Sequence, residues 1–166
     1  MKRKPYAFTL VELMIVVTLL GILSALVVPT FQGNATEAKE SAAQSNLRAM
    51  RSQISLYKLH HNGTFPGYIG GALQDAATAT GQLTGTSAAD GNYSAAKQPA
   101  GIYVHGPYLL EIPPNPFNNL NTIAFSSDFA ADAGTVSSGW LYNPATGEIR
   151  LNWTGTDRNG KRYDEY

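Results

Sequence analysis

The sequence contains no cysteine among its 166 residues. Disulfide bonds, thiolate catalysis and cysteine-based zinc sites are therefore excluded. The length allows one domain of ordinary size plus an anchor. Small domains outside the cytoplasm often rely on disulfides, so this chain needs another source of stability: a long helix, a metal ion or neighbouring subunits.

The formal net charge of the chain is zero, because twelve basic residues balance twelve acidic ones. No global basic field points to nucleic acid as a partner. The usual catalytic motifs are missing as well: there is no glycine-rich phosphate loop, no His-Glu-x-x-His and no Gly-x-Ser-x-Gly. We therefore expect a protein that is not an enzyme and has no catalytic residues, with an enzymatic head on an anchor as the minor alternative.

The charges that are present are distributed unevenly. Three basic residues fall within the first four, whereas residues 13–28 carry no charge at all. The flanking residues extend this apolar segment to 8–31, which is interrupted only by Glu12. A membrane-spanning helix needs about 20 apolar residues, and the basic start favours a cytoplasmic amino terminus. The pattern predicts a single-pass transmembrane helix over residues 8–31.

Glu12 is the exceptional residue of that segment. An ionised side chain within the hydrocarbon costs roughly 2.5–3.5 kcal/mol on insertion scales. Such a charge normally has a partner, so we interpret Glu12 as an assembly device. In the alternative interpretation its carboxylate reaches the headgroups and only adjusts the depth of the helix.

Residues 7–13, Ala-Phe-Thr-Leu-Val-Glu-Leu, resemble the cleavage region of type IV prepilins and type II secretion pseudopilins. The resemblance implies that residues 1–7 are a leader and that a prepilin peptidase cuts between Ala7 and Phe8. The same enzyme then methylates the new amine, leaving N-methylphenylalanine at Phe8, and the apolar segment stays on the mature protein. The residue before the cut is usually glycine in that family, so Ala7 is a departure and slower cleavage is expected. A secretory signal cut after Ala25 and an uncleaved anchor are the alternatives.

Cleavage would give Phe8 a cationic amine four residues before Glu12, on the same helix face. In a helical filament the glutamate can instead meet the amine of an incoming subunit, and opposite charges attract far more in low dielectric than in water. Three of the twelve basic residues precede the cut, so residues 8–166 carry nine basic and twelve acidic side chains.

Residues 32–62 are predicted to form the amphipathic half of a long amino-terminal helix, whose transmembrane half is residues 8–31. Apolar residues recur there at spacings of four and three, on one face of an amphipathic helix: Ala43, Leu47, Met50, Ile54 and Tyr57. Gly63 suits a left-handed cap that would end this helix. We expect the apolar stripe to pack against a globular head.

The basic residues of the same region form a modest patch, expected to be solvated rather than to contact DNA or lipid: Arg48, Arg51, Lys58, His60 and His61. As a metal pair, His60 and His61 are a weak candidate, because neighbouring residues on a helix point in different directions.

The head, residues 63–166, is predicted to be a small antiparallel sheet. Residues 139–143 and 148–153 flank a Pro-Ala-Thr-Gly turn and form a hairpin. Residues 123–125 supply a third strand, residues 102–112 a short extended piece, and residues 67–101 a long loop with a short helix at 72–79. A sheet packed on the amphipathic helix gives an α+β, pilin-like fold.

Two further stretches resemble the same family. Residues 57–66 are pilin-like, and residues 106–117 resemble the segment of major pseudopilins that leads into a proline-rich turn. In that family Asp-Pro-Trp often follows, and here Asn115-Pro116-Phe117 replaces it, so any metal role of that carboxylate is in doubt. Type IV pilins often close the carboxy-terminal loop with a disulfide, which this chain cannot form.

The resemblance implies a structural subunit of a type II secretion pseudopilus that supports protein export. Its expected partners are further copies of itself, prepilin peptidase, an inner-membrane assembly platform and minor pseudopilins. The head would be periplasmic and part of a periplasmic filament. The alternatives are a type IV pilus subunit (adhesion, twitching or DNA uptake) and a membrane-anchored binding or sensor protein, whose ligand site residues 67–101 would form.

The carboxy-terminal tail contains a fragment of a calcium loop, Asp-x-Asn-Gly, with further oxygen ligands nearby. The candidate ligands are Asp157, Asn159 and Asp164. Some major pseudopilins bind calcium near this end, which makes calcium the one cofactor to test. A solvated polar tail is the alternative, because the complete loop motif is absent.

Overall fold

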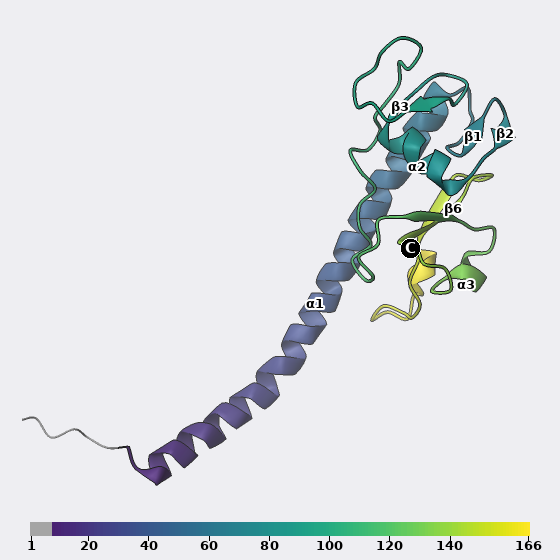
Figure 1. The fold of residues 1–166 in the computed structure, drawn as a ribbon. Helices are drawn as coiled ribbons and strands as arrows, with labels where there is room; N and C mark the ends of the chain where they lie inside the picture. Colours follow the sequence, from purple (N-terminus) through teal and green to yellow (C-terminus); the bar gives the residue numbers. More distant parts are fainter. Residues whose placement is uncertain (1–7) are drawn as a thin grey trace, which may run out of the picture. The chain divides into compact units, whose positions relative to one another are not determined.

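The computed structural model describes residues 8–166, with side chains except for those of residues 25–34. The predicted leader, residues 1–7, therefore lies outside the described residues. The chain divides into two compact units at the boundary between Ala38 and Lys39. One helix, α1 (Leu10–His60), contributes residues to both (Figure 1). The predicted segment boundaries at residues 31 and 62 stay predictions.

The first unit consists of the amino-terminal part of α1. Its twelve large apolar side chains between Phe8 and Leu23 are each 50–83% exposed. Within the described residues, no helix has both the length and the apolar character needed to cross a membrane. The predicted transmembrane segment 8–31 includes residues 25–31, whose side chains lie outside the description, and it stays a prediction.

The second unit, Lys39–Tyr166, is built on the rest of α1. The predicted stripe is confirmed as core: Ala43, Leu47, Met50, Ile54 and Tyr57 are each at most 2% exposed. Burying one large apolar side chain stabilises a fold by about 1.5–3 kcal/mol, so this stripe fixes which face of α1 meets the head.

The carboxyl end of α1 also matches the prediction. Asn62 and Gly63 adopt positive φ angles of 53° and 85°. The Gly63 N–H donates to the Lys58 carbonyl oxygen at 2.9 Å, which satisfies one of the last helical acceptors.

The main sheet has the strand order β5–β6–β7. The predicted hairpin is present: β6 (Trp140–Asn143) pairs antiparallel with β7 (Glu148–Leu151). The third predicted strand, β5 (Ile123–Phe125), is also present but runs parallel to β6. A parallel neighbour needs a crossover, and residues 126–139, with the short helix α3 (Phe129–Asp132), provide it. The α+β fold class is confirmed.

Residues 67–101 are more ordered than the predicted loop (Figure 1). They form two small antiparallel pairs, β1 (Tyr68–Ile69) with β2 (Ala72–Leu73) and β3 (Thr86–Ser87) with β4 (Tyr93–Ser94). Helix α2 (Ala76–Thr84) begins after its Asp75 cap, later than the predicted 72–79.

One buried polar side chain explains why this order was missed. Gln82, with no exposed surface, accepts from the Gly67 N–H at 2.6 Å and donates to the carbonyl oxygens of Tyr68 and Gly91 at 2.8 and 2.7 Å. Hydrophobic periodicity does not register a core made of hydrogen bonds.

The remaining segments connect these elements. Within the described residues, 102–112 contain no named strand, and isolated bridges join Tyr103 to Ala100 and His105 to Ser87. The chain closes with a 3-10 turn, η1 (Tyr163–Glu165). Tyr163 in this turn donates to Glu40 of α1 at 2.8 Å, so the carboxy-terminal segment is tied to the helix.

Candidate assembly segment and basic hollow

The first turn of α1 is closed by a reciprocal pair of side chains. The Glu12 carboxylate accepts from the Thr9 N–H at 2.9 Å and from the Thr9 hydroxyl at 2.8 Å. The Glu12 N–H donates to the Thr9 hydroxyl oxygen at 3.2 Å. Thr-x-x-Glu is a capping box, in which each residue satisfies a free donor of the other. The Thr-x-x-Glu pattern of a capping box is visible in the sequence, but hydropathy alone does not reveal it.

The single-chain arrangement therefore gives Glu12 a local partner. Phe8 is 83% exposed, and Ala7 lies outside the described residues. The proposed cut between these two residues, and the pairing of Glu12 with the amine of Phe8 in another subunit, stay predictions.

The apolar segment that follows contains a threonine whose hydroxyl is satisfied within the helix. The Thr18 hydroxyl donates to the Met14 carbonyl at 2.6 Å, so it needs no outside partner. Exposed apolar surface on this scale marks a site of contact with protein or lipid. At Thr18 the segment can therefore pack against other apolar helices without leaving that hydroxyl unpaired.

The predicted calcium ligands are held by protein contacts in the carboxy-terminal segment. Asp157 Oδ1 accepts from the N–H groups of Asn159 and Lys161 at 2.8 and 2.9 Å, and Oδ2 accepts from the Tyr166 hydroxyl at 2.9 Å. Partial burial acts to raise the pKa of Asp157, but these hydrogen bonds outweigh it and lower the pKa below its ordinary value.

Asp164 forms an ion pair with Arg162 at 2.8 Å. Within the described residues no cluster of three or more His, Asp or Glu side chains could hold a metal ion. Calcium would have to compete with the contacts of both carboxylates, and its binding stays a prediction.

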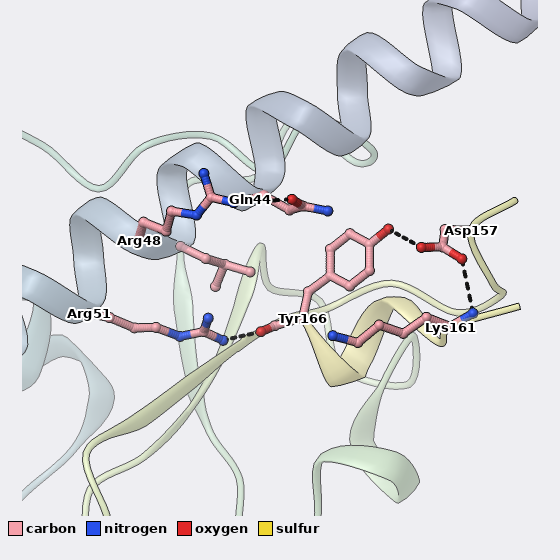
Figure 2. Close-up of a pocket in the computed structure, with 7 residues that line it drawn as sticks. Gln44, Arg48, Arg51, Asp157, Lys161 and Tyr166 are labelled. Carbon is pink, nitrogen blue, oxygen red and sulfur yellow. Dashed lines mark hydrogen bonds between the residues drawn. The ribbon is translucent and has the colours of Figure 1, made fainter. Parts of the chain in front are cut away.

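A basic hollow lies where the carboxy-terminal segment meets α1 (Figure 2). Its volume is about 220 Å³, and its charged lining residues are Arg48 and Arg51 on the helix and Asp157 and Lys161 opposite them. Arg51 Nη2 donates to the carbonyl oxygen of Ile149 at 2.9 Å and to a main-chain oxygen of Tyr166. Burial lowers the pKa of Arg51, and the nearby Arg150 lowers it further. The hollow is therefore a concave surface with an excess of positive charge.

The residues of the predicted basic patch lie in two separate places in the structure. Arg48 and Arg51 face this hollow, whereas His60 and His61 lie at the end of α1 with the third histidine, His105. The His60 and His105 rings stack with centroids 4.9 Å apart, and those of His61 and His105 lie 5.3 Å apart. Sequence analysis could not predict this cluster, because His105 is distant in the chain.

His61 is the buried member of the histidine cluster, only 1% exposed. Its ring stacks on that of Tyr57 at a centroid distance of 3.7 Å. Its Nδ1 lies 2.8 Å from the Tyr57 carbonyl oxygen and its Nε2 lies 3.0 Å from the Ser87 hydroxyl. Burial is the main reason that the pKa of His61 is lowered.

The amino-terminal segment of the chain matches a known family model. The family model described as the prokaryotic N-terminal methylation motif matches residues 2–28. This match confirms the predicted resemblance to processed, methylated precursors.

Part of the chain is also similar to curated proteins of the type II secretion system. The chain is 42% identical over 66 residues to type II secretion system core protein G of Dickeya chrysanthemi, covering 40% of this chain and 42% of the relative. It is 43% identical over 61 residues to the protein of the same name from Aeromonas hydrophila, covering 37% and 43%. The chain thus matches about two fifths of the length of these relatives. No solved structure matches.

Proposed function

We propose that this chain is a structural subunit of a type II secretion pseudopilus that supports protein export. The observation that carries the proposal is the methylation motif over residues 2–28, joined to an apolar helix whose side chains are 50–83% exposed between Phe8 and Leu23. The likeness to core protein G favours secretion over a type IV pilus.

The mechanism is mechanical rather than chemical. A prepilin peptidase removes residues 1–7 and methylates Phe8, while the apolar helix holds the subunit in the inner membrane with its head in the periplasm. An assembly platform then transfers the subunit to a growing filament together with minor pseudopilins. There the exposed apolar side chains pack against those of other copies, and Glu12 meets the amine of Phe8 in a neighbouring copy.

The head acts as the outward-facing part of each subunit. Its core is closed by the buried stripe of α1 and by the β6–β7 hairpin, with Trp140 and Ile149 fully buried. Without disulfides, its stability rests on this packing and on contacts such as that of Tyr163 with Glu40. A filament would add intersubunit contacts.

Mass spectrometry of the mature amino terminus tests the processing step. The full chain is expressed with a prepilin peptidase, and the expected first residue is methylated Phe8. The variant Ala7→Arg should remain uncut, while Ala7→Gly should be cut at least as completely as the parent. An intact Met1 in the parent would indicate a simple anchor, and a start beyond Ala25 a secreted soluble domain.

Filament formation tests the structural role. Sheared material from cells that contain the secretion assembly system should include filaments of the processed chain, visible by electron microscopy. Processed chain that remains monomeric in the membrane under those conditions would contradict the proposal.

A further inference from the structure

Two features of the head lie on opposite flanks of α1. Asn46 Nδ2 donates to the Pro114 carbonyl oxygen at 3.3 Å, which places the proline-rich segment beside Asn46. Arg48 borders the basic hollow. At 3.6 residues per turn, positions two apart lie about 160° from each other around a helix. The hollow and the proline-rich segment therefore flank the helix on different sides.

Two cations line the hollow opposite each other, Arg48 on α1 and Lys161 on the carboxy-terminal segment. The nearest polar contact of Arg48 is Gln44 Oε1, at 3.5 Å. The Lys161 ammonium faces the Tyr166 ring, 5.3 Å from its centroid. Among the described residues, neither of these two cations forms an ion pair with a side-chain carboxylate. The one side-chain carboxylate of the lining, Asp157, is held by Tyr166 and two backbone N–H groups, and the nearby Lys161 charge also helps to lower its pKa.

On the flank of α1 that carries the proline-rich segment, Glu111 is an exposed acidic residue. It forms no hydrogen bond or ion pair within the part of the chain that the structure describes. Its neighbour Leu110 is 83% exposed, while Ile112 on its other side is only 3% exposed and belongs to the core. Lys97 Nζ also donates to the Leu110 carbonyl at 3.1 Å. The Leu110–Glu111 pair is thus presented outward from an anchored segment.

We propose that the basic hollow of one head receives the Glu111 side chain of a second copy of this chain. The inference rests on the proposed filament function and names a contact between its heads. Arg48 and Lys161 would bind the carboxylate, and Leu110 would cover apolar surface beside it. A contact between two different surfaces of the same molecule is heterologous, and repeated heterologous contacts build open helical filaments.

Charge complementarity favours a second copy over a free anion. Residues 8–166 carry nine basic and twelve acidic residues, so the surface elsewhere has acids in excess while the hollow has cations in excess. A small anion would neutralise the hollow but would leave Glu111 without a partner on every copy. Head-to-head stacking satisfies both groups with one contact.

Charge reversal in the full-length chain tests the contact. Arg48→Glu and Glu111→Arg should each lower filament yield at least about tenfold, because like charges are then juxtaposed. The double variant should recover most of the yield. Asp132→Arg, which reverses a carboxylate that lines a different hollow, is the matched control and should assemble normally. Thermal melting of each variant checks that its head is folded.

Cross-linking gives a second readout. Because the chain contains no cysteine, the introduced cysteines are the only thiols that the reagent can join. The pair Arg48→Cys with Glu111→Cys, treated with a short bismaleimide in assembled filaments, should give a ladder of multimers. The pair Arg48→Cys with Asp132→Cys should not. If the parent assembles but the double reversal fails to recover, or the test pair gives no ladder, the head contact is wrong and the filament function stands. If the processed parent does not assemble, the proposed function fails.

Discussion

Thr9 and Glu12 bond to each other at the start of α1, with the carboxylate of Glu12 accepting from both the N–H and the hydroxyl of Thr9 at 2.9 and 2.8 Å. The glutamate that we assign to assembly is therefore already occupied within a single subunit. In a filament it would exchange Thr9 for the amine of a neighbouring Phe8. The capping box keeps the charge partnered until that exchange.

The two roles of Glu12 can be separated by substitution. Glu12→Ala should leave membrane insertion intact but strongly reduce filament yield, because it removes the assembly charge together with the carboxylate half of the capping box. Thr9→Val removes only the hydroxyl of the capping box, which costs about 1 kcal/mol of helix stability, and should assemble nearly as well as the parent. Filament yield and membrane fractionation are the measurements. Equal yields for the parent and Glu12→Ala would refute the pairing.

The buried histidine predicts a pH dependence of head stability. The pKa of His61 is lowered in the folded state, chiefly by burial, so the unfolded chain takes up a proton first as pH falls. The contribution of neutral His61 is present above its ordinary pKa of about 6.5 and is lost as pH falls through the lower folded pKa. Melting temperature should therefore decrease as pH is lowered from 7 toward 5.

A matched pair of variants assigns this effect. His61→Gln should flatten the dependence on pH, whereas His60→Gln, at the exposed neighbouring position, should preserve most of it. Tyr57, Ser87, His60 and His105 face the ring, and Asp90 lines the adjoining pocket. Carboxylates titrate mostly below pH 5. An unchanged slope in His61→Gln would remove His61 as the cause.

Buried Gln82 should be among the most sensitive positions of the head. Gln82→Leu keeps the volume but leaves three backbone groups, those of Gly67, Tyr68 and Gly91, without their partner. Each unsatisfied buried group costs about 1–3 kcal/mol, so we expect a loss of several kcal/mol in a denaturant titration. Gln74→Leu, at an exposed position, should change stability by less than about 0.5 kcal/mol. Similar losses in the two variants would contradict this account.

Calcium is tested by its effect on melting. If Asp157, Asn159 and Asp164 hold a calcium ion, a chelator should lower the melting temperature, and added Ca²⁺ should restore it while Mg²⁺ should not. Asp157→Asn should abolish the Ca²⁺ response. A melting temperature that chelation does not move would leave the tail with only the structural contacts seen to Tyr166 and Arg162.

Local periodicity in the amino-acid sequence was enough to predict several features of this protein. The stripe from Ala43 to Tyr57, the helix end at Gly63 and the β6–β7 hairpin all follow from spacings within a few residues. The leader resemblance is local in the same sense, and the family model found it in residues 2–28. Such features need no partner from elsewhere in the chain.

Contacts between residues that are distant in the chain could be identified only in the folded protein. Gln82 holds Gly67 and Gly91, His105 joins His60 and His61, and the carboxy-terminal segment completes a hollow with Arg48 and Arg51. These contacts are polar or involve loops, so they leave no hydrophobic period in the sequence. The parallel pairing of β5 with β6 belongs here too, because strand direction is set by the route of a crossover and not by the strand residues.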